Sequence, residues 1–292
     1  MEIRQLEYFQ MTCRLSSISK AAEQLHVAQP SVSIAIQKLE EELGVQLFQR
    51  TQRQISLTSE GHIFLQRVNT ILTQLEDSIN EMKDLQLHPK SSIKIGIPPM
   101  IGVLLFPEIF AQFRKQYPHI ELSAVEGGSL SIQNLVEQNR IDIGIITQSK
   151  SSPLLKTLPI TTGQIHVCLP LHHPLGSLPS ISFDQLHDQP FILLKEDTYN
   201  RKVVIEECKK HHFTPNIVFS SSQIETIISL VELDIGISFL FDTIAKKYPT
   251  IHSCPLSEPL NFQIVLAWNP NRYLTNAAKA FIDFMTHLQP QQ

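Results

Sequence analysis

Residues 17–44 contain two short helical patterns separated by a few residues, and this spacing constrains the fold more than any other feature of the chain. The first pattern covers residues 20–25, where Ser19 can serve as an N-cap. Ala21 and Ala22 are small enough to let another helix approach closely. The sequence therefore predicts two helices packed against each other across a short turn.

The second helix is expected to begin at Pro30, a favoured first helical position, and to end near Gly44. Its apolar residues form one stripe that must face a core, and they are Val32, Ile36, Leu39 and Leu43. The helical period of about 100° per residue then assigns the opposite face. That face carries Pro30, Ser31, Ile34, Gln37, Lys38 and Glu41, with Ser33 at its edge.

This outward face has the chemistry that recognition of the DNA major groove requires. Gln29 and Gln37 can pair with base edges, and Ile34 can lie against a thymine methyl group. Ser31 and Ser33 can donate to phosphates or bases. The expected DNA-binding residues on this helix are Gln29, Pro30, Ser31, Ser33, Ile34, Gln37 and Lys38. The alternative is an ordinary helical hairpin with a solvated polar face.

Residues 47–58 form two strand-like pieces around a polar turn, which is typical of the wing of a winged helix-turn-helix. Arg50 and Arg53 lie in and beside this turn. Arginines at these positions would contact phosphates, release counterions and position the helix without reading sequence. We therefore add both residues to the expected DNA interface.

The segment over residues 21–61 resembles the winged helix-turn-helix of LysR-type transcriptional regulators. The matching residues, in order and without gaps, are Ala21, Ala22, Leu25, Gln29, Pro30, Ser33, Leu39, Glu40, Leu43, Gly44, Leu47, Phe48, Arg50, Arg53, Leu57, Thr58 and Gly61. The chain departs from the family at Ile34 and Ala35, where a basic residue and a glutamine are common. It departs again at Gln52, where the family has glycine in the wing.

A heptad-like seam follows the wing. It consists of Leu65, Val68, Leu72, Leu75, Ile79 and Met82, at alternating intervals of three and four residues. Such a seam favours pairing with one other helix, and the alternative is a long helix packed on its own domain. In the resembled family this helix is the dimer linker. Two subunits would then present two reading helices to an imperfect inverted repeat.

Beyond residue 90, short apolar strands alternate with helices. Strands are expected over 93–97, 120–125 and 141–146, with helices over 103–116 and 131–139. A second set of strands is expected near His166 and over 190–194, 216–219, 235–240 and 261–268, with a terminal helix over 274–288. This alternation predicts an α/β fold with a mainly parallel, doubly wound sheet and two lobes.

The resemblance implies a complete domain plan. Residues 1–58 would form the DNA-binding domain, residues 59–90 the dimerisation helix and hinge, and residues 91–292 the effector-binding domain. The last would resemble periplasmic binding proteins, with one lobe over about 91–161 plus 267–292 and the other over about 162–266. A ligand cleft would lie between these lobes.

In open α/β sheets, ligands bind beyond the carboxyl ends of the strands, so the loops there supply the candidate effector site. The expected residues are Pro99, Met100, Gly128, Ser129, Thr147, Gln148, Thr198, Asn200, Arg201, Ser222 and Gln223. Amides and hydroxyls at helix starts can hold a small anion, with Arg201 as a counter-charge. Because residues 98–101 are apolar, a small organic acid or another partly apolar metabolite fits best. The alternative interpretation is that these amides and hydroxyls only cap helices and that Arg201 is a solvated surface residue.

Composition limits the other possibilities. The 292 residues carry a formal net charge of −4, so any DNA contact must come from a local patch rather than from the overall charge. The start of the chain does not resemble a signal peptide, and no apolar run is long enough for a membrane span, which together predict a cytoplasmic protein. Four widely spaced cysteines suggest buried thiols rather than a zinc site. No cofactor, metal or catalytic motif is predicted.

These patterns together predict a transcriptional regulator rather than an enzyme. Its expected partners are double-stranded DNA, a small-molecule effector, further copies of itself in a homodimer or homotetramer, and RNA polymerase if it is an activator. A solute-binding protein of the same two-lobed fold, without specific DNA binding, is the competing class. A DNA-binding protein with an unused cleft is an intermediate possibility.

Overall fold

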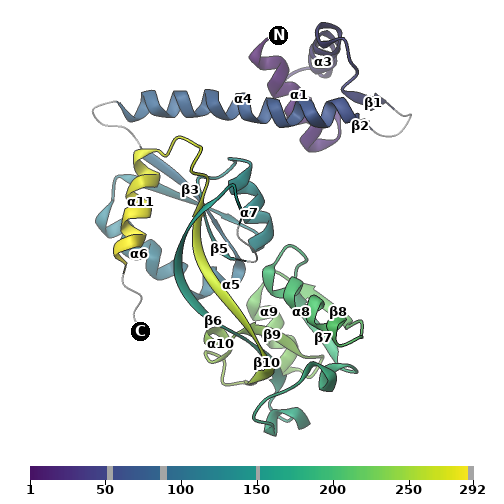
Figure 1. The fold of residues 1–292 in the computed structure, drawn as a ribbon, viewed down its shortest axis with the longest axis vertical. Coiled ribbons are helices and arrows are strands. Elements are labelled where there is room, and N and C mark those ends of the chain that lie inside the picture. Colours follow the sequence, from purple (N-terminus) through teal and green to yellow (C-terminus); the bar gives the residue numbers. More distant parts are fainter. Residues whose placement is uncertain (51–54, 86–90, 149–151, 289–292) are drawn as a thin grey trace. The chain divides into compact units, whose positions relative to one another are not determined.

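The computed structural model describes residues 1–50, 55–85, 91–148 and 152–288. The chain divides into two compact units, residues 1–85 and residues 86–292. Figure 1 shows the helices and strands of each unit. Each unit has its own hydrophobic core, and each is described by itself.

The N-terminal unit is helical with a small two-stranded sheet. Its elements are α1 Ile3–Leu15, α2 Ile18–Gln24, α3 Gln29–Leu43, β1 Phe48–Arg50, β2 Ile55–Leu57 and α4 Ser59–Asp84. Strands β1 and β2 pair antiparallel, as expected for a wing. Phe9 of α1 is fully buried and packs against Phe48 and Phe64, with ring centroids 5.3 Å apart in each pair. These contacts join α1, the wing and α4 in one core.

The boundaries of the two central helices differ slightly from the prediction. Helix α2 begins at Ile18, and its cap is Ser17, whose hydroxyl accepts from the N–H of Lys20, rather than Ser19. Helix α3 begins one residue before Pro30. The intervening turn is made without glycine because His26 adopts a φ of 54°, a left-handed conformation that histidine tolerates better than most residues.

The apolar stripe of α3 is buried as expected, with one exception. Val32, Ile36 and Leu39 have no exposed surface, whereas Leu43 is 36% exposed at the helix end. Including Leu43 in the buried stripe was therefore wrong, because α3 ends there and Gly44 turns the chain away with a φ of 69°. The predicted outward face is exposed, with Ser33 intermediate at its edge.

The wing is fixed to the helices by buried polar contacts. The carboxylate of Glu40, which is 4% exposed, accepts from the N–H groups of Leu47 and Phe48 at 2.8 and 3.1 Å. Thr58 caps α4 by accepting from the N–H of Gly61 at 2.9 Å. A Cβ at Gly61 would lie 2.1 Å from the carbonyl oxygen of Leu47, so only glycine allows this approach. These contacts hold Leu47 and Phe48, at the start of the wing, against α3 and against the start of α4.

Helix α4 has 26 residues, and its apolar seam changes character along its length. Val68 is fully buried in the N-terminal core, and Leu72 packs against that core. Toward the other end, Ile79 and Met82 are 46% and 58% exposed. The second half of α4 therefore presents apolar side chains that its own unit does not cover.

The C-terminal unit is built around a six-stranded sheet in the order β4-β3-β5-β10-β6-β9, with a second sheet of β7 and β8. The strands are β3 Ser91–Ile97, β4 Ile120–Glu126, β5 Ile143–Thr147, β6 Lys156–Pro170, β7 Pro190–Leu194, β8 Asn216–Ser221, β9 Ser238–Phe241 and β10 Ile251–Trp268. The helices are α5 Pro99–Leu104, α6 Phe106–Gln116, α7 Ser129–Glu137, α8 Tyr199–Lys210, α9 Ile224–Glu232, α10 Asp242–Ala245 and α11 Asn276–His287, with short 3-10 helices at Pro174–Ser177 and Phe183–Leu186.

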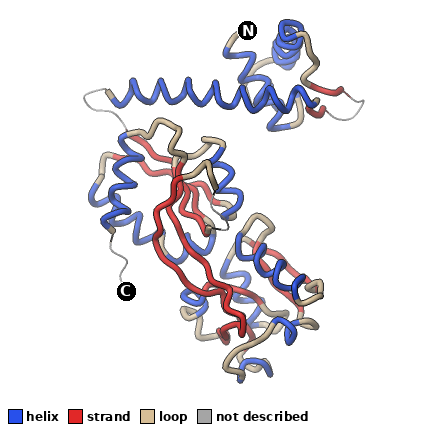
Figure 2. Tube along the Cα trace, viewed as in Figure 1, coloured by secondary structure: helices blue, strands red, loops and turns tan. Residues whose placement is uncertain are grey.

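Two lobes are visible in this unit, joined by the long strands β6 and β10 (Figure 2). We call the part containing β3, β4 and β5 with helices α5, α6, α7 and α11 the first lobe. The part containing β7, β8 and β9 with helices α8, α9 and α10 is the second lobe. Helix α11 packs on β3, so the end of the chain returns to the first lobe.

The sheet is more mixed than the sequence predicts. Strand β3 pairs parallel with β4 and β5, and β7 pairs parallel with β8, as alternating strands and helices require. Strand β10, however, runs antiparallel to both β5 and β6. Strand β6 also runs antiparallel to β9. The expectation of a mainly parallel sheet is therefore correct for the β3-β4, β3-β5 and β7-β8 pairs and wrong for the rest of the six-stranded sheet. A single helix over 103–116 is also wrong, because the chain breaks at Leu105 into α5 and α6.

Candidate DNA interface and effector cavity

Helix α3 presents a polar face to solvent in the N-terminal unit. Gln29, Ser31 and Gln37 are exposed on this face, as are Pro30 and Lys38. Ile34 is 52% exposed on the same face. The face therefore combines amides, hydroxyls, one ammonium group and one aliphatic side chain over residues 29–38 of the helix.

Two of the amides on α3 already have partners. The side-chain oxygen of Gln29 accepts from the Ser19 hydroxyl at 3.1 Å, and the side-chain nitrogen of Gln37 donates to Glu41 at 2.9 Å. All four residues are exposed, so these bonds compete with water and are readily exchanged for base contacts. Each glutamine keeps at least one amide group for such a contact.

The two arginines expected at the wing are not placed. Arg50 ends strand β1, and only its backbone belongs to the part of the chain that the structure describes. Arg53 lies outside the described residues. Their phosphate contacts remain predictions from the sequence.

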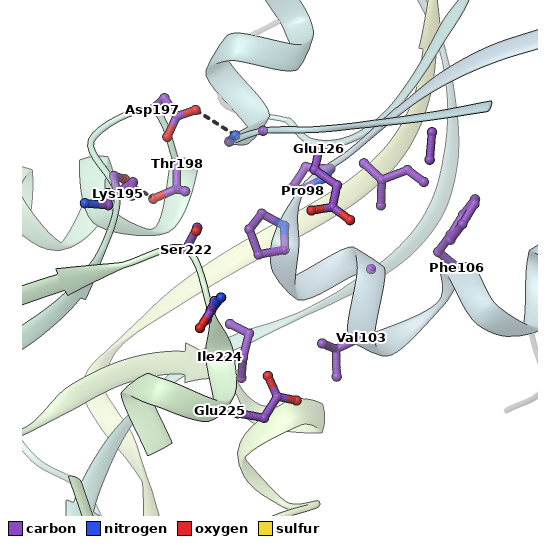
Figure 3. Close-up of a pocket in the computed structure, with 17 residues that line it drawn as sticks. Pro98, Val103, Phe106, Glu126, Lys195, Asp197, Thr198, Ser222, Ile224 and Glu225 are labelled. Carbon is purple, nitrogen blue, oxygen red and sulfur yellow. Dashed lines mark hydrogen bonds between the residues drawn. The ribbon is translucent and has the colours of Figure 1, made fainter. Parts of the chain in front are cut away.

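A cavity of about 650 Å³ lies between the two lobes of the C-terminal unit (Figure 3). Five of the predicted effector residues line it, namely Pro99, Gly128, Thr198, Ser222 and Gln223. They come from the loops after β3, β4, β7 and β8, because the carboxyl ends of these strands face one another across the gap. This volume is in the range of pockets that take small organic molecules.

A second, much smaller cavity of about 10 Å³ is lined by four further predicted residues, Met100, Ser129, Thr147 and Asn200. It shares Pro98, Pro99 and Thr198 with the larger cavity. Ser129 and Thr147 are joined by a hydrogen bond of 3.2 Å from the backbone N–H of Thr147 to the serine hydroxyl. The small cavity thus lies beside the larger one, and its mostly apolar lining includes the polar side chains of Ser129, Thr147 and Asn200.

Two predicted effector residues line neither cavity. The guanidinium of Arg201 donates to the Leu194 carbonyl at 3.2 Å and to the Ser220 hydroxyl at 2.7 Å, within the second lobe. It also forms an ion pair with Glu196 at 3.4 Å. Gln148 donates its backbone N–H to the carbonyl of Gln263. The expected counter-charge for an anion is therefore committed to contacts in its own lobe.

Several lining residues were missed in the sequence. Val103 and Phe106 give the larger cavity an apolar wall, and Glu126, Asp197 and Glu225 give it carboxylates. Glu126 ends strand β4 and Asp197 lies in the loop after β7, so the rule that selected Gly128 and Thr198 should have included them. Glu225 lies in the first turn of α9, a helix that was not predicted explicitly.

The two lobes are joined directly at the start of α7. The carboxylate of Asp197 accepts from the backbone N–H of Gly128 at 2.7 Å, a contact drawn in Figure 3. The carbonyl of Asp197 accepts from the N–H of Leu130 at 3.0 Å. A Cβ at Gly128 would lie 2.2 Å from that carbonyl oxygen, so the second lobe approaches α7 this closely only because residue 128 is glycine.

Both units match models of known protein families. Residues 3–62 match the bacterial regulatory helix-turn-helix of the LysR family, and residues 87–289 match the LysR substrate binding domain. The chain belongs to the LysR family of regulators. The resemblance seen in residues 21–61 is thereby confirmed, and it extends over nearly the whole chain.

Full-length relatives agree with this assignment. An uncharacterized HTH-type transcriptional regulator of Bacillus subtilis, YwbI, is 32% identical, with 97% of this chain and 95% of that protein covered. The B. subtilis regulator AlsR is 32% identical over 85% of this chain and 83% of its own length. The crystal structure of HinK, a LysR-family regulator from Pseudomonas aeruginosa, is 27% identical, covers 97% of each chain and superposes with a TM-score of 0.57.

The LysR-family assignment gives the chain its general activity. It is a DNA-binding transcriptional regulator with an effector-binding domain, not an enzyme. Its four cysteines are free thiols, and burial raises the pKa of Cys208 to about 12, which keeps this thiol protonated and unreactive.

The described residues hold neither a metal-binding cluster nor a membrane-spanning helix. They include no group of three or more His, Cys, Asp or Glu residues arranged to hold a metal ion. They also contain no helix with the length and apolar character needed to cross a membrane.

Proposed function

We propose that this LysR-family regulator binds an imperfect inverted repeat in promoter DNA through two α3 helices and responds to a small molecule held between the lobes of its C-terminal unit. The observation that carries the proposal is the pairing of an exposed polar reading face on α3 with a separate cavity of about 650 Å³. The α3 face would recognise DNA, and a small molecule in the cavity would control how the protein binds that DNA.

In this proposal Gln29, Ser31 and Gln37 read base edges in the major groove, and Ile34 contacts a thymine methyl. Lys38, Arg50 and Arg53 contact phosphates, which positions α3 and makes binding depend on salt. This division assigns sequence selectivity to the start of α3 and general affinity to the basic side chains.

The exposed half of the α4 seam supports pairing of two subunits. Ile79 and Met82 are large apolar side chains at the heptad positions, and because about half of each is already covered, burying the rest in a partner helix would stabilise the dimer by roughly 1 kcal/mol each. A dimer presents two α3 helices to two half-sites, which accounts for recognition of an inverted repeat. Two such dimers would form the homotetramer.

Control follows from the position of the cavity. A molecule that contacts both lobes stabilises whichever relative arrangement of the lobes fits it best. The effector can shift the regulator only by its difference in affinity for two arrangements. We propose that this shift alters the spacing of the two reading helices, and that the chain acts in the cytoplasm, contacting RNA polymerase if it is an activator.

The test is binding of the full-length protein to duplexes that carry an inverted repeat, measured against duplexes with one half-site scrambled. The repeat is taken from promoter fragments that the protein itself selects. The proposal expects the scrambled duplex to bind at least about tenfold more weakly at equal salt, since one reading helix loses its bases. Equal affinity for both duplexes would contradict the proposal.

A further inference from the structure

The cavity between the lobes carries an excess of negative charge. Its lining contains three carboxylates, Glu126, Asp197 and Glu225, and one ammonium group, Lys195. Glu126 and Glu225 are exposed, and they come from opposite lobes, at the end of β4 and in the first turn of α9. In Figure 3 the nitrogen of Lys195 points away from both carboxylates. The open part of the cavity is therefore acidic.

Two groups that could hold an anion in this cleft, the start of α7 and Arg201, are already occupied. The start of α7 has its N–H at Gly128 bound by the Asp197 carboxylate, so a ligand carboxylate would have to displace Asp197. Arg201 is committed to Leu194, Ser220 and Glu196 in its own lobe. An organic acid would find Lys195 as the cation of the cavity lining and would face the carboxylates of Glu126 and Glu225.

A buried amide gives a second, independent indication of a ligand. Asn200 is 2% exposed, and neither its side-chain nitrogen nor its side-chain oxygen has a hydrogen-bond partner among the described residues. It lines the small cavity beside Ser129 and Thr147. Leaving a buried amide unpaired is costly, so this position is suited to a polar group that completes its hydrogen bonds. The amide oxygen of Asn200 and the serine and threonine hydroxyls can accept from an ammonium group, while the Asn200 amide nitrogen can donate to a second polar group of the same ligand.

The remaining wall is apolar. Val103 and Phe106 from the first lobe and Ile224 from the second lobe line the larger cavity. A hydrocarbon chain or ring placed between them would be removed from water on both sides. The site thus combines acidic and acceptor groups with an apolar surface.

We infer that the effector of this regulator is a small amine that carries an ammonium group on a partly apolar body, rather than the organic acid that the loop sequences suggested. The inference rests on the proposed function, because it names the class of molecule that the effector cavity takes. Glu126 and Glu225 supply charge complementarity, and Asn200 supplies a hydrogen-bond acceptor.

The test uses three molecules of similar size that differ in the polar group: hexylamine, 1-hexanol and hexanoate. Binding of each to the full-length protein is measured by calorimetry at constant pH and ionic strength. Hexylamine should bind at least about tenfold more tightly than hexanoate, because Glu126 and Glu225 attract an ammonium group and repel a carboxylate. Equal or tighter binding of hexanoate, or no hexylamine binding at tens of millimolar, would overturn the inference.

Charge-neutral variants locate the site. Glu126→Gln and Glu225→Gln should each weaken hexylamine binding by roughly threefold to tenfold and leave 1-hexanol binding unchanged. Asn200→Leu should weaken hexylamine as well, since it removes the buried acceptor while preserving volume. Glu121→Gln, on the same strand as Glu126 and outside both cavities, is the matched control and should have no effect. An equal loss in the control would contradict the site assignment.

Parallel DNA measurements separate this inference from the proposed function. If the protein binds a selected inverted repeat specifically but does not prefer hexylamine, the effector class is wrong and the regulator stands. If it prefers hexylamine but does not bind DNA specifically, the cavity assignment stands and the proposed function is wrong.

Discussion

The carboxylate of Asp197 in the second lobe accepts a hydrogen bond of 2.7 Å from the backbone N–H of Gly128 in the first lobe. It caps helix α7, whose own N-cap residue has no side chain to do so. A carboxylate at a helix N-terminus is favourable both as an acceptor and through the helix dipole. Gly128 and Asp197 both line the candidate effector cavity. A movement of the two lobes apart at this point would lengthen or break their hydrogen bond.

Gly128→Ala is expected to separate the lobes at this point. The new methyl group would lie 2.2 Å from the Asp197 carbonyl oxygen, which is backbone and cannot swing aside. We expect a loss of about 1–3 kcal/mol in the free energy of unfolding of the C-terminal unit, and a changed effector response. Denaturant unfolding and effector-dependent DNA binding of the full-length protein measure the two effects.

Gly127→Ala is the matched control for that substitution. Its Cβ would lie 3.5 Å from the nearest side-chain atom, on Ile132, which is ordinary contact. We expect the free energy of unfolding to change by less than about 1 kcal/mol. If both alanine variants behaved alike, the close approach of Asp197 would not be what residue 128 provides.

Gln29→Ala should reduce DNA affinity by roughly 1–3 kcal/mol at one base position and little elsewhere, because a bidentate amide contact reads a single base. Lys38→Ala should weaken binding to all sequences similarly and reduce the dependence on salt. Affinities for every single-base variant of the selected repeat distinguish the two patterns. An equal loss across all base variants for Gln29→Ala would remove this residue from the reading set.

Ile79→Asp should shift the protein from dimer to monomer at micromolar concentration, because a charge would be buried in the α4 seam. Gln74→Asp, at an exposed position on the face of α4 away from the seam, should leave the dimer intact. Sedimentation equilibrium of both variants measures the dimer dissociation constant. A dimer that survives Ile79→Asp would place the subunit contact elsewhere.

His166 should make the stability of the C-terminal unit depend on pH. Burial lowers the pKa of His166 below its ordinary value of 6.5, with Asp242 opposing and Lys246 reinforcing the shift. The unfolded chain then takes up the proton first, so stability is lost as the pH falls through 6.5 toward the lower folded pKa. Above 6.5 the neutral ring makes no contribution to the pH slope.

The slope is tested with His166→Gln, which keeps a partner for the Ser253 hydroxyl now 3.0 Å from the imidazole Nδ1. Thermal unfolding from pH 7 to pH 5 should fall less steeply in this variant than in the wild type. His172→Gln, at an exposed position, should retain the wild-type slope. An unchanged slope in His166→Gln would assign the pH dependence to other groups.

The sequence was most informative where one periodicity governs a whole element. Val32, Ile36 and Leu39 share one face of α3, and their burial follows from spacing alone. Leu43 has the same spacing but lies at the end of α3, where the core no longer covers it, and the helical period carries no information about where that core ends. The break at Leu105 was missed for a related reason, since apolar residues continue on both sides of it.

The candidate effector site was predictable only in part. The rule that ligands meet the carboxyl ends of strands selected Gly128, Thr198 and Ser222, and all three line the cavity. The same rule could not show that the guanidinium of Arg201 turns to Ser220, because that contact joins residues 19 apart through the fold of the second lobe. The sequence likewise could not show which charged side chains of the two lobes meet in the cavity, because the long strands β6 and β10 set how the lobes are placed.

The most direct test of the account is an in vitro selection of fragmented DNA from the source genome by the purified full-length protein at moderate salt. The account predicts strong enrichment of a few fragments that share an imperfect inverted repeat, with half-sites about one or a few helical turns apart. Uniform, salt-sensitive recovery of all fragments, or no recovery, would contradict the claim that the chain is a sequence-specific regulator.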